Sequence, residues 1–441
     1  MARVTLNAVQ RLYGTIAVPG DKSISHRAVM LNALAQGQAT ITNFLDGADC
    51  RSTVTCLQAL GVPIVQHGET VQVQGVGLRG LQEPALLLDC GNSGTTLRLF
   101  AGILAGQPLF AVLSGDASLQ ARPQRRIVEP LRQLGAWLDG RSDGNYAPLA
   151  VRGHALHGGS YTLPVASAQV KSALLLAALS GDAPLTLTGR IDSRDHTERM
   201  LQAMGAQLTT HPEHIVLYPP AMTADASLQS LSLRVPGDPS SAAFWWVAAA
   251  IHPNAQITTE GVCLNPTRTG ALDVLQAMGA AISISHTRTE GCEPVGDVTV
   301  RSSHLQATDI RGSLIPRLID ELPILALAAA CAQGTTTIAD AQELRIKETD
   351  RIAAVAEALS AFGSTVSSHP DGMTITGHPA GLPHGATVSS LGDHRLAMAW
   401  AIAALVAPGA TTIQQADAVA VSYPAFWAQL KQLDVDVTIG D

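Results

Sequence analysis

Hydrophobic positions along the chain fall into short runs typical of strands and longer apolar runs typical of helices. Thr15–Val18 predicts a strand and Ala28–Leu34 predicts a helix, and Pro19–Arg27, with the sequence PGDKSISHR, stands between them. A Pro-Gly turn followed by a serine suits the start of a helix. Lys22 and Arg27 lie beside the predicted helix N-terminus, whose N–H groups attract anions. This segment is therefore a candidate anion site.

A leucine pattern, L-x-x-hydrophobic-G, recurs along the whole chain at intervals of 70 to 84 residues. It predicts a helix that ends at glycine and is followed by a strand. The copies are Leu57–Gly61, Leu131–Gly135, Leu201–Gly205, Leu275–Gly279 and Leu359–Gly363, with a degenerate sixth at Leu430–Asp434. Polar helix-start signals recur in phase at Lys22–Ser23, Asn92–Thr95, Ser167–Gln169, Pro239–Ser241, Asp320–Glu321 and Gly392–His394. The series predicts six units of strand, capped helix, strand, second helix and one or two further strands.

A length of 441 residues is too great for one ordinary core, so we expect two domains of three units each. The PGD turn at Pro19 returns in Val235–Ser241, VPGDPSS, which has no lysine or arginine. We place the chain crossings at these two turns, so that residues 21–236 form one domain and residues 237–441, together with 1–20, form the other. Two short crossings predict a hinge with a cleft between the domains.

Composition narrows the classes of function. A net charge of −8 argues against a general nucleic-acid or polybasic membrane role, so we expect no nucleic-acid or membrane partner. The longest apolar runs, Leu396–Ala407 and Leu322–Ala332, are shorter than the ~18 residues of a membrane-spanning helix. Met1–Thr5 lacks the apolar stretch of a signal peptide. The six cysteines show no disulfide or zinc spacing. We expect a soluble cytoplasmic protein without a metal.

Arginines recur near one phase of the repeat, between its two helices. A single loop arginine is usually a solvated surface residue. Five at a similar phase would instead gather on one face, which suits phosphate and carboxylate groups. They are Arg51, Arg122, Arg194, Arg268 and Arg351.

The densest charge run, Arg345–Arg351 (RIKETDR), has two interpretations that the residues alone leave open. In one it is a surface helix with ion pairs three residues apart. In the other, Lys347 and Arg351 share a helix face and clamp an anion beside Glu348, which then carries a proton. A P-loop, GxGxxG, HExxH and GxSxG are all missing, which disfavours nucleotide, zinc and serine-hydrolase mechanisms.

Three segments, Pro19–Arg27, Gly91–Arg98 (GNSGTTLR) and Arg345–Arg351, resemble the signatures of the 5-enolpyruvylshikimate-3-phosphate (EPSP) synthase family, and the resemblance covers essentially the whole chain. It implies an α/β fold, the two-domain inside-out barrel of enolpyruvyl transferases with three βαβαββ repeats per domain. It also implies transfer of the enolpyruvyl group of phosphoenolpyruvate to the 5-hydroxyl of shikimate 3-phosphate, through a tetrahedral intermediate and without a cofactor. The active site would lie in the cleft, and the protein would be a monomer.

The resemblance also implies roles for individual residues. The catalytic residues are Lys22, Asp320 and Glu348. Shikimate 3-phosphate is expected to contact Lys22, Ser23, Arg27, Ser167, Ala168, Gln169, Ser193, Arg194, Asp320 and Lys347. Phosphoenolpyruvate is expected to contact Lys22, Gly94, Arg122, Gln169, Arg351 and Arg395.

The chain departs from the best-known family branches at several positions. It has no lysine in Ala420–Pro424 (AVSYP), Ala168 replaces a common serine, and Ser193–His196 (SRDH) resembles a second bacterial class. Some members of that class tolerate the inhibitor glyphosate. Gly94 usually leaves room for it, so we expect sensitivity or modest tolerance.

Two rival functions remain. UDP-N-acetylglucosamine enolpyruvyl transferase shares the fold and the donor, but it normally has a reactive cysteine where this chain has Ala117. A non-catalytic sugar-phosphate binding protein would have no need for Lys22, Asp320 and Glu348 together.

Overall fold

The computed structural model describes residues 2–220 and 227–440. Within them the chain forms six four-stranded sheets, and each sheet contains one parallel pair of strands next to antiparallel ones. The described residues contain no helix with the length and apolar character needed to cross a membrane.

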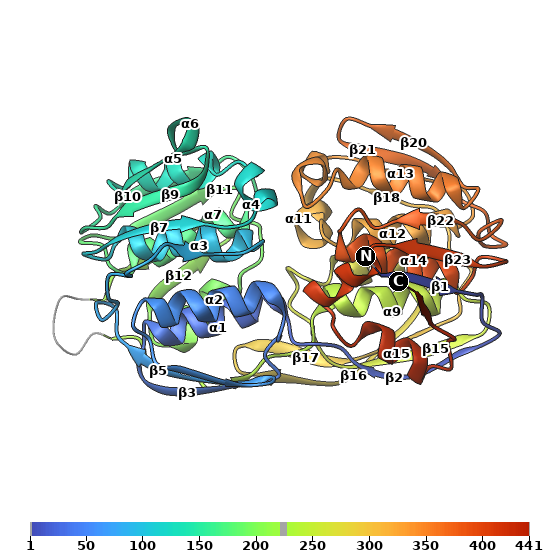
Figure 1. Cartoon of the computed structure of the whole chain (residues 1–441), viewed down its shortest axis with the longest axis horizontal. Helices are drawn as coiled ribbons and strands as arrows, with labels where there is room; N and C mark the ends of the chain where they lie inside the picture. The colour runs from blue at the N-terminus through green and yellow to red at the C-terminus, as the bar shows by residue number, and fades with distance from the viewer. Residues whose placement is uncertain (1, 221–226, 441) are drawn as a thin grey trace. The chain divides into compact units, whose positions relative to one another are not determined.

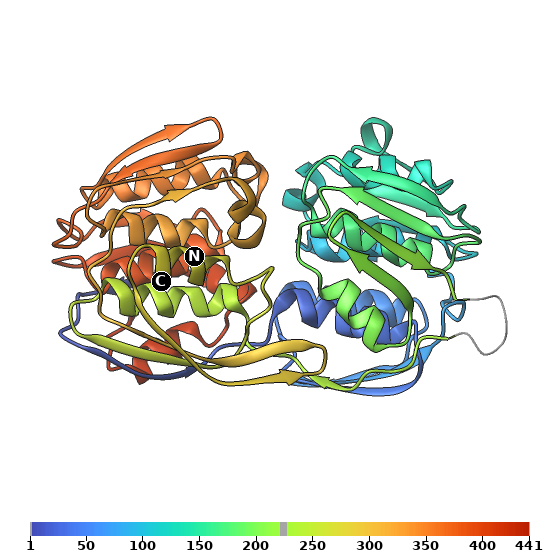
Figure 2. The ribbon, with the colours of Figure 1, turned by 180° about the vertical axis from the view of Figure 1, so that it is seen from behind.

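The chain divides into two compact units, each described here by itself. The first unit is Gly20–Val235 together with Thr289–Glu293, and the second unit holds the remaining described residues. The sequence analysis placed 289–293 in the second domain, and this was wrong. These residues lie at the turn of the β16–β17 hairpin (yellow in Figures 1 and 2). Glu293 is buried there, and its Oε1 lies 2.7 Å from Nδ1 of His196, which belongs to the first unit.

The first unit contains three sheets. Their strand orders are β14(Leu233–Arg234)–β3(Gln36–Thr42)–β5(Thr70–Val76)–β4(Ile64–His67), β6(Leu88–Asp89)–β7(Phe110–Ser114)–β9(Tyr146–Arg152)–β8(Trp137–Gly140) and β10(Gly159–Leu163)–β11(Leu185–Gly189)–β13(His214–Tyr218)–β12(Gln207–His211). The first helices of the repeats are α1(Lys22–Ala33), α3(Gly94–Ala105) and α7(Ala168–Ala178), and the second helices are α2(Ala48–Ala59), α5(Arg125–Gln133) and α8(His196–Ala203). Two short helices, α4(Ala117–Ala121) and α6(Arg141–Gly144), complete the unit.

The second unit repeats this plan. Its sheets are β16(Ala281–Glu290)–β17(Glu293–Arg301)–β15(Ala255–Cys263)–β2(Leu12–Ala17), β18(Asp309–Ile310)–β19(Thr335–Ile338)–β21(Gly372–Thr376)–β20(Thr365–His369) and β22(Thr387–Ser389)–β23(Thr411–Gln414)–β1(Arg3–Leu6)–β24(Thr438–Gly440). The first helices are α9(Pro239–Ile251), α12(Leu322–Ala330) and α14(His394–Ala404), and the second helices are α10(Gly270–Ala277), α13(Arg351–Ala361) and α15(Phe426–Gln432). The short helix α11(Ile315–Leu318) and the 3₁₀ turns η1(Gly312–Leu314), η2(Gln342–Ile346) and η3(Ala416–Val421) lie between them.

Strand exchange occurs at the two PGD turns. Strand β2 directly precedes α1 in the chain but pairs in parallel with β15 of the second unit. Strand β14 precedes α9 but pairs in parallel with β3 of the first unit. The turn itself is tight, because a Cβ on Gly20 would lie 1.9 Å from the carbonyl oxygen of Asn43. Glycine is therefore needed at position 20, where the chain passes from one unit to the other.

Helices form the centre of each unit and sheets form its outside. In the second unit α9, α12 and α14 pack against one another, and in the first unit α3 packs against both α1 and α7 (Figure 1). α12, with the sequence LPILALAAA, is buried along its whole length, as expected for a helix that is apolar on all sides. The strands instead alternate, as in β9, where Ala147, Leu149 and Val151 are buried. Small apolar residues let these helices approach closely.

The predicted helix ends are confirmed. The five glycines that close the second helices have φ between 84° and 91°, the left-handed region that favours glycine. Asp434 takes the same region in the sixth copy, with φ 62°. The predicted serine start of the first helix was wrong, because Asp21 caps α1 by accepting from the Ile24 N–H at 2.9 Å. Because Asp21 is the cap, Lys22 and Ser23 lie in the first turn of the helix.

Candidate active site

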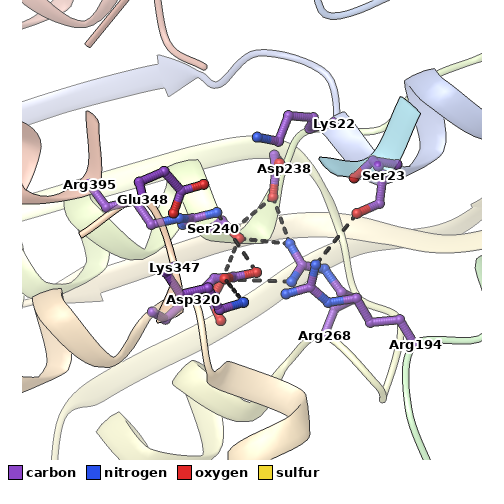
Figure 3. A network of polar contacts seen from close by, with 12 residues as sticks. Lys22, Ser23, Arg194, Asp238, Ser240, Arg268, Asp320, Lys347, Glu348 and Arg395 are labelled. Atoms are coloured by element: carbon purple, nitrogen blue, oxygen red, sulfur yellow. Dashed lines mark hydrogen bonds and ion pairs between the residues drawn. The ribbon is translucent and has the colours of Figure 1, made fainter. Parts of the chain in front are cut away.

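Lys22 is the first residue of α1, and its side chain is held at its tip. Nζ lies 3.0 Å from Asp49 Oδ2, from the first turn of α2. Arg194 Nη1 donates a long hydrogen bond, 3.5 Å, to the hydroxyl oxygen of the next residue, Ser23 (Figure 3). Three residues predicted to bind shikimate 3-phosphate therefore lie at the N-terminal end of α1 or beside it.

Arg27 is buried, and each of its nitrogens donates to a neighbour. Nε donates to Thr197 Oγ1 at 2.7 Å, Nη2 to Ser172 Oγ at 2.8 Å, and Nη1 to the Ser23 carbonyl at 2.9 Å. Burial lowers the pKa of Arg27 to about 10, against the opposing effect of Glu198. The guanidinium is thus a fixed cation at neutral pH.

The predicted phosphoenolpyruvate contacts of the first unit surround the start of α3. Ser93 caps this helix, so that Gly94 is its first residue. Arg122 Nη2 donates to Asn92 Oδ1 at 2.6 Å, which orients that guanidinium toward the loop before α3. Arg122 closes α4, one of the short helices.

Gln169 is tied to the same helix. Arg98 Nη1 donates to Gln169 Oε1 at 2.7 Å, and Gln169 Nε2 donates to Thr95 Oγ1 at 3.2 Å. Arg98 Nε also donates to Gln124 Oε1 at 2.9 Å. Gln169 is thereby fixed in one amide orientation, beside Ser167, which caps α7, and Ala168, which begins it.

The loop between β11 and α8 presents Ser193 and Arg194. The Ser193 side chain is buried, and its Oγ has no hydrogen-bond partner among the described residues. A buried hydroxyl in that condition suits a ligand oxygen, since buried polar groups in native proteins are normally paired.

In the second unit, Asp320 is surrounded by cations (Figure 3). Lys347 Nζ lies 3.2 Å and Arg351 Nη1 3.6 Å from Oδ1, and Arg395 Nη2 lies 4.0 Å from Oδ2. These cations stabilise the carboxylate form, which can accept a proton. Residues from three segments that are distant in the sequence are brought together here.

Glu348 joins this group through Arg351. Arg351 Nη2 donates to Glu348 Oε2 at 2.7 Å and Nε to Asp393 Oδ2 at 2.7 Å, with the Arg351 side chain 1% exposed. Burial opposes the charge of Arg351, but Asp393, Glu348 and Asp320 raise its pKa. Burial likewise opposes ionisation of Asp393, but Arg351 lowers its pKa.

The predicted helical clamp of Lys347 and Arg351 was wrong in its geometry. Asp350 accepts from the Ala353 N–H and caps α13, so that helix begins at Arg351 and Lys347 lies before it. Lys347 pairs with Asp320 instead of with Asp350. The surface-helix interpretation fails for the same reason, although one of its two ion pairs, Glu348–Arg351, is present at 2.7 Å.

A second charged cluster lies at the start of α9, and the sequence analysis assigned none of it to the site. Arg268 Nη2 donates to Asp238 Oδ1 and to Ser240 Oγ, both at 2.8 Å. Ser240 Oγ also donates to Glu321, the residue next to Asp320 (Figure 3). The recurring arginine pattern did signal Arg268, whereas Arg51 of the same series is exposed and pairs with Asp46.

The family model for EPSP synthase (3-phosphoshikimate 1-carboxyvinyltransferase) matches residues 6–430. The chain belongs to the EPSP synthase family. It is similar to the 3-phosphoshikimate 1-carboxyvinyltransferase of Roseiflexus sp. (strain RS-1), at 68% identity over 96% of this chain and 97% of the relative. The corresponding protein of Geobacillus thermodenitrificans is 54% identical over 96% of this chain and 97% of its own.

Solved structures agree with this family. An EPSP synthase from Acinetobacter baumannii superposes with a TM-score of 0.89 at 37% identity, with 100% of both chains covered. The enolpyruvyl transferase NikO from Streptomyces tendae gives 0.81 at 19% identity, over 100% of this chain and 99% of that one, which shows the fold alone. The predicted two-domain enolpyruvyl transferase fold is confirmed.

Family membership also bears on the rival functions. The UDP-N-acetylglucosamine alternative is not favoured. Ala117 is the first residue of α4, which ends before Arg122. The described residues contain no group of three or more histidine, cysteine, aspartate or glutamate side chains that could hold a metal ion.

Proposed function

We propose that Lys22, Asp320 and Glu348 carry the proton transfers of the EPSP synthase reaction in this chain. As a member of the family, the chain transfers the enolpyruvyl group of phosphoenolpyruvate to the 5-hydroxyl of shikimate 3-phosphate and releases phosphate. The observation that carries the assignment is the cationic setting of Asp320, with Lys347, Arg351 and Arg395 around its carboxylate.

The first half of the reaction is an addition. Asp320 accepts the proton of the 5-hydroxyl as its oxygen forms a bond to C2 of phosphoenolpyruvate, and the methylene carbon gains a proton from Glu348 to become a methyl group. The product is a tetrahedral ketal. Positioned acids and bases of this kind contribute about 10²–10⁴ in rate.

The second half is an elimination. A proton leaves the methyl carbon for Glu348 as the carbon–oxygen bond to phosphate breaks, and phosphate departs with the electron pair of that bond. Lys22 assists by neutralising the developing charge on the bridging oxygen or by donating a proton to it. The pair of Glu348 with Arg351 holds this carboxylate in one place for both transfers.

Binding of the two anionic substrates uses both units. We assign the carboxylate and phosphate of shikimate 3-phosphate to first-unit residues, namely Ser23, Arg27, Ser167, Ala168, Gln169, Ser193 and Arg194, with Lys22, Asp320 and Lys347 near the reacting hydroxyl. We assign phosphoenolpyruvate to Lys22, Gly94, Arg122, Gln169, Arg351 and Arg395. Fixed cations of this kind bind anions without reorganisation at the moment of reaction.

Phosphate release from phosphoenolpyruvate tests the proposal, with shikimate 3-phosphate as acceptor and UDP-N-acetylglucosamine as the control acceptor. We expect turnover with the first acceptor alone. Glu348→Gln should lower kcat by about 10²–10⁴, whereas Glu357→Gln, an exposed position on α13, should leave it unchanged. Tight binding of shikimate 3-phosphate without turnover would indicate a binding protein on this fold.

We also propose that the chain acts as a monomer in the cytoplasm, where its phosphorylated substrates are retained because such anions do not cross membranes unaided. Light scattering across a range of concentrations should give the mass of one chain, 45.9 kDa. A mass twice this value would contradict the proposal.

A further inference from the structure

Lys171 is a buried lysine near the start of α7, between Val170 and Ser172. Its side chain is 1% exposed, and its ammonium has three neighbours. Nζ donates to the carbonyl oxygens of Ile191 at 3.0 Å and Ser193 at 2.9 Å, and lies 2.7 Å from Glu198 Oε1. Two of the three N–H donors of the ammonium thus go to backbone carbonyls, and its charge is balanced by the ion pair with Glu198.

The two carbonyls belong to the β11–α8 loop, which also presents Ser193 and Arg194. This loop turns sharply, with the Ile191 N–H bonded to the Gly189 carbonyl and the Ser193 N–H bonded to the Ile191 carbonyl, both at 2.8 Å. The loop therefore bends around the ammonium and points two carbonyls at it. Without a cation at that place, the Ser193 carbonyl would lose its bond from Lys171, and the Ile191 carbonyl would keep only its bond from the Ser193 N–H.

Glu198 completes the arrangement from α8, with its side chain 3% exposed. A neighbour of each residue accepts from Arg27: Ser172, which follows Lys171 on α7, and Thr197, which precedes Glu198 on α8. The two hydroxyls lie 2.7 Å apart. Each helix thus contributes two adjacent residues. One belongs to the Lys171–Glu198 ion pair beside the loop, and the other binds the Arg27 guanidinium.

We propose that the Lys171–Glu198 ion pair positions the phosphate subsite for shikimate 3-phosphate, with Lys171 acting as an internal cation that sets the backbone of the Ser193–Arg194 loop. The inference rests on the proposed function, which places the phosphate at this loop. Ser193 Oγ, buried and without a partner among the described residues, is the group whose direction the loop controls. Lys171 itself is engaged with the protein and acts through Ser193 and Arg194.

A purely structural role is the alternative, and a pair of hydrophobic replacements separates the two. Removing one member of a buried ion pair leaves an uncompensated charge, whereas replacing both with apolar residues of similar size is often neutral for stability. The double variant Lys171→Met/Glu198→Leu has no buried charge, but it also lacks the hydrogen bonds from Lys171 to the Ile191 and Ser193 carbonyls. Stability and substrate binding should therefore separate in the double variant.

The experiment measures thermal stability, the Kd of shikimate 3-phosphate in the binary complex, and the KM of each substrate. We expect Lys171→Met to lose both stability and affinity. The double variant should regain most of the stability but still bind shikimate 3-phosphate about tenfold or more weakly, since bonds to a charged group are lost. The KM of phosphoenolpyruvate should stay within about twofold.

Two further variants keep the test decisive. Lys171→Arg keeps the charge opposite Glu198 but its planar fork cannot reproduce the three-way contact, so affinity for shikimate 3-phosphate should still fall. Arg190→Ala removes the exposed Arg190–Asp192 pair of the same loop and should leave affinity unchanged. If the double variant, or Lys171→Arg where the double variant does not fold, binds shikimate 3-phosphate like the wild type, the inference is overturned.

The two proposals fail in different ways. Wild-type protein that does not turn over shikimate 3-phosphate would refute the proposed function. Normal wild-type turnover with unchanged Kd in these variants would refute the role of the ion pair alone.

Discussion

Asp393 joins two arginines of the proposed phosphoenolpyruvate site. Its carboxylate accepts from Arg351 Nε at 2.7 Å, and the same carboxylate caps α14 by accepting from the Arg395 N–H at 2.9 Å. Asp393 therefore fixes the position of the Arg351 side chain relative to the start of α14, where Arg395 lies.

Asp393→Asn should weaken phosphoenolpyruvate binding more than shikimate 3-phosphate binding. An amide can still cap the helix, but it leaves the buried Arg351 without its strongest counter-charge. We expect a loss of about 3–5 kcal/mol in the free energy of unfolding, as for other broken buried pairs, and a raised KM for phosphoenolpyruvate. Asp350→Asn, which keeps the cap of α13, is the matched control for urea denaturation and kinetics. Equal effects on both substrates would contradict this role.

Gly94→Ala should disturb the contact between Arg98 and Gln169. A Cβ on Gly94 would lie 2.7 Å from Arg98 Nη1, closer than ordinary contact, so the guanidinium must move. That nitrogen donates to Gln169 Oε1. We expect a higher KM for phosphoenolpyruvate and weaker inhibition by glyphosate, to which the wild type should be sensitive or modestly tolerant. A wild-type inhibition curve that stays flat into the millimolar range, or unchanged kinetics in the variant, would contradict this.

Asp320→Asn and Glu321→Gln should have opposite profiles although the residues are adjacent. Asp320→Asn removes the proposed base, so kcat should fall by about 10²–10⁴ while stability changes little. Glu321 is buried against Ser240 and Arg268, so Glu321→Gln should mainly lower stability. Steady-state kinetics and thermal melts on both variants check this. A larger loss of kcat in Glu321→Gln than in Asp320→Asn would exchange the two roles.

The repeat was predictable because it depends on local chemistry. A helix that ends in the left-handed region needs glycine or a tolerant residue, so Gly61 and Asp434 both mark helix ends in the sequence. The same locality explains why the arginine series located Arg122, Arg194 and Arg351. Their roles came from resemblance to the family, because spacing alone does not show what an arginine faces.

The remainder depends on contacts that are distant in the sequence. The sequence analysis did not single out Lys171, whose partner Glu198 lies on another helix. The PGD turns marked where the chain crosses between units, but the strands that β2 and β14 pair with left no local signal. Glu293 was assigned to the wrong domain because a hairpin turn carries no mark of the surface it meets. The prediction that Lys347 and Arg351 share a helix face was wrong because Asp350 caps α13, so the helix begins after Lys347.

His26 makes stability depend on pH. It is fully buried on α1, with Nδ1 2.7 Å from Thr53 Oγ1, and burial lowers its pKa from 6.5 to about 3. Lys22 and Arg27 lower it further, against the opposing effect of Asp49. Because the pKa in the folded state lies below that of the unfolded chain, the unfolded chain binds the proton first as the pH falls. The stabilising contribution is complete above pH 6.5 and is lost progressively from there toward pH 3.

The contribution of His26 can be measured by urea denaturation at several pH values between 7 and 4.5. The wild type should lose up to about 1.4 kcal/mol per pH unit from this one group below its unfolded pKa. In His26→Asn that part of the slope should vanish, so the stability difference between wild type and variant should shrink as the pH falls. His304→Asn, at an exposed position, should retain the wild-type slope. Parallel pH profiles for wild type and His26→Asn would show that the buried imidazole takes up its proton in the folded state as readily as in the unfolded chain.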